Sequence, residues 1–178
     1  PFAFEGQMRR QAAEAGLARL EEHADTVITI PNDRLLHLSE EEMPLTEAFH
    51  MADDVLRQGI QGISDVITVP GEVNLDFNDV KKIMGEGGHA LMAIGSGEGE
   101  NRTVQAAQQA ITSPLLETDI TGARRVLFNV TTSGSLGLKE LNMAAKVIQE
   151  MVDPSAEIIF GTAIDPTMSE DAVKITVI

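Results

Sequence analysis

Three polar side chains are spaced at the start of a predicted helix in a way that suits phosphoryl-transfer chemistry. Asn74, Asp76 and Asp79 stand in the run Asn-Leu-Asp-Phe-Asn-Asp, where a helix is predicted over residues 76–84. Residues three apart share one face of a helix, so both carboxylates would point outward at its N-terminal end. Two carboxylates backed by an amide can orient and polarise a water for attack on a phosphoryl group. The same residues could instead be helix caps.

A second group of residues could bind a purine base. Asn32 lies in a Pro-Asn-Asp turn that follows a predicted strand, and Phe49 and Asp54 lie in a long predicted helix. Ligands of α/β sheets bind outside the carboxyl ends of strands. An aromatic ring can offer its face to a base, and a carboxylate can accept both N–H donors of guanine's edge. The alternatives are structural, because Asp54 could pair with Arg57 and Phe49 could pack in the core.

Other chemistries find little support in the sequence. Four histidines, at positions 23, 37, 50 and 89, lack metal-ligand spacing and there is no Cys, so no metal site is predicted. The nucleophile elbow and the G-x-x-x-x-G-K-[ST] phosphate loop are also missing. The run Gly95-Ser-Gly-Glu-Gly99 lies where a dinucleotide fingerprint would lie, but its third glycine comes one residue early and its acidic residues would repel a pyrophosphate. We expect a glycine-rich tight connection there.

Periodicity predicts the elements that must position these residues. Apolar residues at three-four spacing predict a surface helix over residues 8–20 and a long helix over residues 45–67, which Pro70-Gly71 ends. Gly59 and Gly62 weaken that helix, so we expect close backbone packing at both. The acidic segment 39–42, Ser-Glu-Glu-Glu, suits a solvated helix start. The remaining pattern alternates strands with helices, which indicates an α/β layer fold; the strands are predicted at 26–30, 89–94, 125–131, 157–164 and 173–178, and the further helices at 101–111 and 138–152.

Composition limits the classes of partner. The chain has 178 residues, 13 Lys+Arg against 28 Asp+Glu, and a net charge of −15. This charge argues against nucleic acid or an anionic membrane surface as a partner, because phosphate binding needs clustered cations. The absence of Cys fits a reducing compartment. The chain starts at Pro1 without a Met and stops inside an alternating β-branched run, so we expect it to be a piece of a longer protein.

Six segments in order along the chain resemble successive motifs of the FtsZ family of bacterial tubulin-like cell-division GTPases. They are PFAFEG (1–6), DTVITIPNDRLL (25–36), ADDVLRQG (52–59), NLDFNDV (74–80), GENR (99–102) and SPLL (113–116). The resemblance implies a tubulin/FtsZ-like α/β fold in three parts. Residues 1–43 would end the GTP-binding domain, residues 44–69 would form the central connecting helix, and residues 70–178 would form the C-terminal activation domain.

The resemblance also implies residue roles. Glu5 and Arg9, Asn32, and Phe49 with Asp54 would contact the nucleotide. Asn74, Asp76 and Asp79 match the family's synergy loop, Asn-x-Asp-Phe-Ala-Asp, which completes the GTP site of the next subunit in a head-to-tail filament. Asn78 replaces the usual Ala, which leaves the rate of GTP turnover open. Thr132-Ser133 replaces the more usual Gly-Gly, with no clear consequence for function.

Further implications concern ligands, partners and location. The complete protein would bind GTP or GDP, and Mg²⁺ could bind together with the nucleotide. This piece would bind no cofactor tightly, because the family's phosphate signature would lie upstream of Pro1. Its partners would be further copies of itself and the missing N-terminal GTP-binding part. It would not insert directly into a membrane, and it would work in the cytoplasm at the division site. Two rivals stay open: a cofactor-binding α/β enzyme that uses Gly95–Gly99, and a non-catalytic α/β interaction module.

Overall fold

The protein is built around a four-stranded mixed sheet, as seen in a computed structural model that describes residues 1–36, 44–116 and 120–178. The strand order is β3-β6-β4-β5, in which β6 runs antiparallel to both β3 and β4, and β4 and β5 are parallel. The strands are β3 (Ala93–Glu98), β4 (Arg125–Thr132), β5 (Glu157–Ile164) and β6 (Ala172–Val177).

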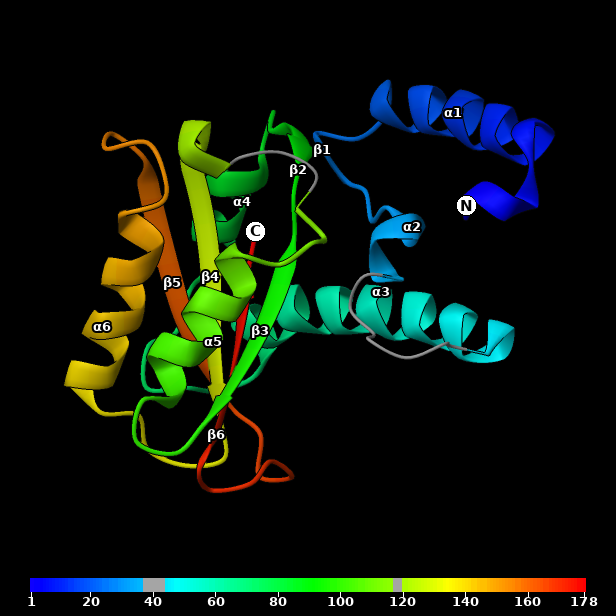
Figure 1. The fold of residues 1–178 in the computed structure, drawn as a ribbon. Helices are drawn as coiled ribbons and strands as arrows, with labels where there is room; N and C mark the ends of the chain where they lie inside the picture. Colours follow the sequence, from blue (N-terminus) through cyan, green and yellow to red (C-terminus); the bar gives the residue numbers. More distant parts are fainter. Residues whose placement is uncertain (37–43, 117–119) are drawn as a thin grey trace.

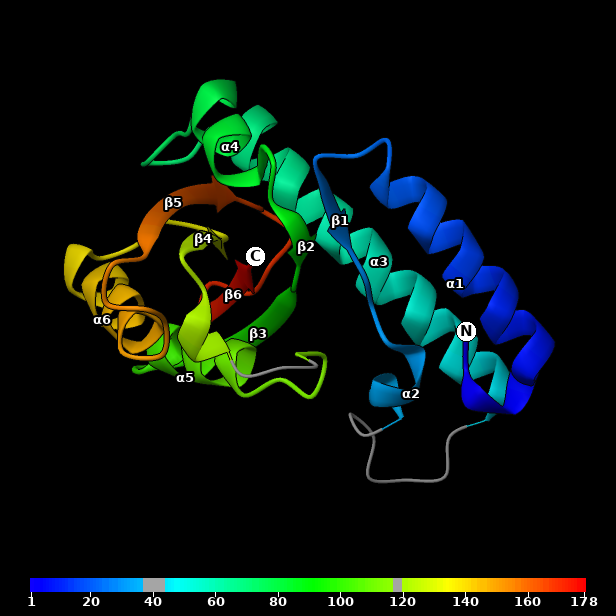
Figure 2. The same ribbon diagram turned by 90° about the horizontal axis from the view of Figure 1, so that it is seen from above.

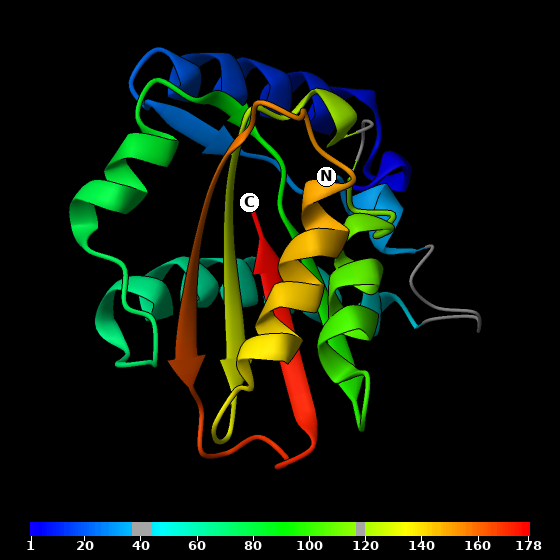
Figure 3. The same ribbon diagram turned by 90° about the vertical axis from the view of Figure 1, so that its left-hand side faces the viewer.

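Helices cover both faces of this sheet (Figures 1 and 3). On one face α5 (Arg102–Ile111) and α6 (Leu138–Gln149) pack onto the sheet, and the core between them contains Phe128, Ile148 and Ile175, all of them fully buried. On the other face lie α3 (Leu45–Thr68) and α4 (Phe77–Met84), which bury Val66, Val80, Ile83 and Leu127. The central strand β4 is accordingly buried on both faces, since all its residues from Val126 to Thr132 are buried.

The first part of the chain lies beside the long helix. It contains η1 (Ala3–Glu5), α1 (Gln7–Glu21), β1 (Thr26–Ile28) and α2 (Asn32–Leu35), and β1 pairs in parallel with β2 (Gly88–Ala90). Leu35 of α2 packs against Val55 of α3 and Met92 in a small second core. These contacts join the first part of the chain to the rest.

The long helix is confirmed almost residue for residue. The pattern predicted residues 45–67, and α3 spans Leu45–Thr68. The expected close packing at its glycines is also found, because a Cβ added at Gly59 would overlap Met92, and one added at Gly62 would lie 3.0 Å from Thr176. The acidic run 39–42 and His37 lie outside the described residues.

Two expectations about residues 89–99 were wrong. The single strand predicted over 89–94 is two strands, β2 and β3, each with different neighbours. Gly95 and Gly97 do not form a connection but lie inside β3, where an added Cβ would overlap backbone oxygens of α5. The absence of these side chains lets α5 lie close against the strand. The rival dinucleotide interpretation places these glycines in a turn between strand and helix, and Gly95 and Gly97 are not in such a turn.

Candidate functional site

The loop between α3 and α4 is held in a defined shape by its own backbone and by β5. Asn74 Oδ1 accepts a hydrogen bond from the Gly71 N–H at 2.8 Å, and Asn74 Nδ2 donates to the Gly71 carbonyl at 3.0 Å. Val73 N–H donates to Thr162 Oγ1 at 2.8 Å, and Thr162 N–H donates to the Val73 carbonyl at 2.9 Å. Asn74 thus closes the loop, and Thr162 fixes it against the sheet.

Asp76 and Asp79 form a reciprocal capping box at the start of α4. Asp79 N–H donates to Asp76 Oδ1 at 3.0 Å, and Asp76 N–H donates to Asp79 Oδ2 at 3.2 Å. The box engages one oxygen of each carboxylate. Asp76 is exposed and Asp79 is half-buried, so the other oxygen of each can accept a hydrogen bond from a water or a partner. Capping and chemistry are therefore compatible in this arrangement.

Four of the five residues predicted to contact a nucleotide meet at one open pocket. Glu5, Arg9, Asn32 and Phe49 line a cavity of about 440 Å³, together with Pro1, Ala12 and Ala13. They come from four elements, namely η1, α1, α2 and α3. The Glu5 carboxylate lies 3.4 Å from Nε of the Arg9 guanidinium. The same carboxylate accepts a hydrogen bond from the Phe2 N–H at 2.7 Å. The pocket is large enough to hold a base and a sugar.

Phe49 is held at this pocket by aromatic contacts rather than by burial in the core. Its ring is edge-on to Phe2 at a centroid distance of 5.4 Å and to Phe4 at 6.3 Å. Phe49 remains 41% exposed, so the core interpretation of this residue is wrong. An exposed ring with a fixed orientation can stack on a base.

The fifth residue, Asp54, points to structural partners instead. Its carboxylate accepts from Arg57 Nη2 at 2.7 Å and from Gln58 Nε2 at 2.6 Å, and the hydrogen bond from Arg57 lowers the pKa of Asp54. The pairing with Arg57 that spacing predicted is confirmed. The adjacent Asp53 lies four residues from Phe49 and so shares its face of α3, although neither aspartate lines the pocket. The i,i+4 spacing makes Asp53 a second candidate for a contact with a ligand.

Phe49 of the pocket lies near the beginning of α3, and the acidic loop follows the other end of this helix, where the chain continues into α4 (Figure 2). Phe49 is near the beginning of the helix and Thr68 is its last residue. At 1.5 Å per residue, the two are separated by about 28 Å along the axis. Asp76 and Asp79 come only after the end of this helix, so the length of α3 separates them from the pocket of the same chain.

Comparison with known proteins agrees with this fold. Residues 88–178 match the model of the FtsZ family's C-terminal domain. The chain superposes on an empty FtsZ dimer of M. jannaschii with a TM-score of 0.93 and 38% identity, covering 99% of this chain and 51% of that one. The chain belongs to the FtsZ family. A point mutant of the same FtsZ matches at 39% identity and TM-score 0.93, over 100% of this chain and 53% of that one.

The fold extends to more distant relatives of FtsZ. CetZ2 of Haloferax volcanii, solved as a GTPγS-bound protofilament, matches with a TM-score of 0.76 at 16% identity over 99% of this chain and 52% of its own. This chain spans about half the length of the FtsZ structures it matches. The match confirms the tubulin/FtsZ-like α/β fold, while the division at residues 43 and 69 stays a prediction.

Two features of the described residues bear on other kinds of site. Within the ranges 1–36, 44–116 and 120–178, no three His, Asp or Glu side chains gather in a way that could hold a metal ion. None of the helices in the same ranges has the length and apolar character needed to cross a membrane.

Proposed function

We propose that this chain is a working part of a GTPase of the FtsZ type, in which Asp76 and Asp79 act on GTP held by the next copy. Asn74 keeps the loop in shape and the two carboxylates orient the attacking water. The copies would stack head to tail, so hydrolysis would follow assembly. In the cell such filaments would act in the cytoplasm, as the division ring at midcell.

The observation that carries this proposal is the distance between the two sites. In a chain that holds its base near Phe49, the end of α3 lies about 28 Å away along the helix axis, and the carboxylates of Asp76 and Asp79 come only after that end. Carboxylates so placed can only serve a second molecule. The relatives solved as a dimer and as a protofilament add support, because they are assemblies of this fold.

The nucleotide would be GTP or GDP, with Mg²⁺ at its phosphates. Glu5, Arg9, Asn32 and Phe49 would contact the base and sugar, and a carboxylate of α3 would accept from the guanine edge. The match to the family motif assigns this carboxylate to Asp54. The shared face of α3 with Phe49 favours Asp53 instead. The phosphates would be bound by the half of the FtsZ fold that the relatives have in addition. We call this chain together with that half the complete protein.

Mixing two defective variants of the complete protein tests the proposal. One variant combines Asn32→Ala with Phe49→Ala and so impairs the pocket; the other combines Asp76→Ala with Asp79→Ala. Neither should hydrolyse GTP well alone. In a mixture, the intact loop of the first can dock on the intact pocket of the second, so the GTP hydrolysis rate should exceed the sum of the separate rates.

The rates alone and mixed distinguish the proposal from its rivals. If Asp76 and Asp79 are only caps, the second variant hydrolyses GTP by itself at nearly the normal rate, as the interaction-module alternative requires. If they act within their own chain, the mixture is no faster than the sum. A mixture of each variant with unaltered protein serves as the control for assembly.

A further inference from the structure

The C-terminal end of α4 is held by a side chain from the central sheet. Arg125, the first residue of β4, donates from Nη1 to the Gly85 carbonyl at 2.7 Å and from Nη2 to the Glu86 carbonyl at 3.1 Å. A guanidinium is suited to this position because it satisfies carbonyls that the helix leaves free and carries the charge that the helix C-terminus favours. The turn that it holds includes Glu86 in the left-handed region, at φ 51°.

A second hydrogen bond reaches the same end of α4 from the first part of the chain. Thr26 Oγ1, on β1, donates to the carbonyl of Met84, the last residue of α4. The pairing of β1 with β2 sets this approach, since Thr26 lies opposite Gly88 and the Gly88 N–H donates to the Asp25 carbonyl at 2.8 Å. Two separate elements thus fix one helix end.

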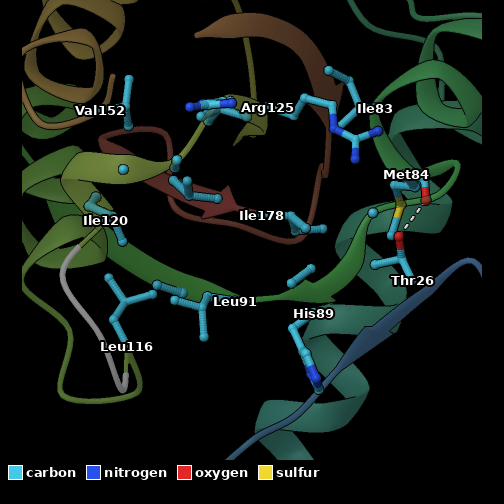
Figure 4. Close-up of a pocket in the computed structure, with 18 of the residues that line it drawn as sticks. Thr26, Ile83, Met84, His89, Leu91, Leu116, Ile120, Arg125, Val152 and Ile178 are labelled. Carbon is cyan, nitrogen blue, oxygen red and sulfur yellow. Dashed lines mark hydrogen bonds between the residues drawn. The ribbon is translucent and has the colours of Figure 1, made fainter. Parts of the chain in front are cut away.

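Packing alone does not fix this end, because it borders a cavity. Ile83 and Met84, in the last turn of α4, line a cavity of about 410 Å³, and Arg125 and Thr26 lie on its wall (Figure 4). On the remaining sides Ile83 is buried in the core cluster with Leu127, and Lys82 forms an ion pair with Glu157 of β5. The hydrogen bonds from Arg125 and Thr26 hold the backbone of this end on the side that faces the cavity.

A movement of the C-terminal end of α4 would also move the carboxylates of Asp76 and Asp79. α4 has eight residues, a rod about 12 Å long, with Asp76 as its N-cap at the opposite end. A helix this short moves as a rigid body, so an axial displacement of Met84 is transmitted to Asp76 and Asp79. Misplacing reacting groups by about 1 Å can cost about a hundredfold in rate.

We propose that Arg125 and Thr26 are positioning residues for the GTPase reaction, which set the axial position of α4 and thereby the reach of Asp76 and Asp79 into the neighbouring copy. This inference rests on the proposed function. Neither residue touches the nucleotide or the loop, so each acts only through α4.

The test uses the complete protein and separates hydrolysis from assembly. The variants are Arg125→Ala, with the adjacent Arg124→Ala as a control of equal charge, and Thr26→Val, with Thr26→Ser as a control that keeps the hydroxyl. For each, the measurements are the GTP hydrolysis rate per assembled subunit at saturating GTP, the threshold concentration for assembly and the melting temperature. We expect Arg125→Ala and Thr26→Val to lower the rate per assembled subunit about tenfold, with the threshold unchanged within twofold.

Both controls should keep the normal rate. Rates of Arg125→Ala and Thr26→Val equal to those of their controls would overturn the inference, and so would losses that merely follow the amount of assembled protein. If Arg125→Ala does not fold, the two Thr26 variants decide alone. Asp76→Asn is measured alongside: when it keeps full hydrolysis, both the proposed function and this inference fail, and when it loses hydrolysis while Arg125→Ala and Thr26→Val do not, only this inference fails.

Discussion

Replacing Asp76 by Asn should separate the capping role of this residue from its proposed role in hydrolysis. Asn and Asp are equally good N-caps, since either can offer a side-chain oxygen to the Asp79 N–H, now 3.0 Å from Asp76 Oδ1. Asp76→Asn should therefore leave the free energy of unfolding almost unchanged. Asp76→Ala removes the cap and should cost about 1 kcal/mol. That loss corresponds to a fall of about 2–4 °C in melting temperature for a folding unit of 150–250 residues.

Hydrolysis should not follow this order of stabilities. If the Asp76 carboxylate orients the attacking water, Asn and Ala both remove it, and both should lower the rate per assembled subunit by about a hundredfold or more. The assay is phosphate release from pre-assembled filaments, with the assembled fraction measured by sedimentation. Glu72→Gln, which removes an exposed charge from the same loop, is the matched control and should hydrolyse GTP normally.

A hydrolysis rate that falls only with the melting temperature would contradict a catalytic role for Asp76. Filaments of Asp76→Asn that release phosphate at the normal rate would show that a neutral cap is sufficient. The carboxylate would then serve only the helix, and the interaction-module interpretation would replace the catalytic one.

Three further predictions concern the pocket and the fold. Asp53→Ala should weaken GTP binding by the complete protein about tenfold in a titration with a fluorescent analogue, because Asp53 shares the Phe49 face of α3. Asp54→Ala should leave GTP binding unchanged. If only Asp54→Ala weakens binding, Asp54 is the residue that contacts guanine. Arg102 donates to Glu140 at 2.8 Å and thereby lowers the pKa of Glu140, so this pair stabilises the fold above pH 4.5 and loses its effect as the pH falls below that value. Glu140→Gln should therefore flatten the acid side of the melting-temperature profile. Glu150→Gln, which removes an exposed ion pair with Lys146, should not. This chain alone, with its net charge of −15, should show no micromolar affinity for GTP by calorimetry.

The sequence predicted the elements well where periodicity is local. The apolar spacing of α3 and of α6 is visible within each helix, so their existence did not depend on what they pack against. Residues 89–99 failed because their structure depends on distant partners. β2 pairs with β1, more than sixty residues earlier, and β3 accepts glycines because α5 lies against it. A glycine in a strand and one in a turn look alike until the neighbouring helix is known.

The same distinction explains what could be predicted of the site. Motif order assigned Glu5, Arg9, Asn32 and Phe49, and the structure brings all four to one pocket. Motif order assigned Asp54 and did not consider the adjacent Asp53, because it carries no information on the rotation of α3 about its axis. It also gave no sign of Arg125, whose partners are backbone carbonyls with no sequence signature of their own.

The length of α3 links the candidate site to the proposed mode of assembly. The pocket at Phe49 near one end of a 24-residue helix and the acidic loop after its other end are two different surfaces. A contact that joins the pocket of one copy to the loop of the next uses two unlike surfaces, so each copy is left with one of each free for a further neighbour. Contacts of this heterologous kind continue into an open filament unless the rotation between copies closes a ring. The filament would thus follow from the same separation that prevents Asp76 and Asp79 from acting on their own chain's nucleotide.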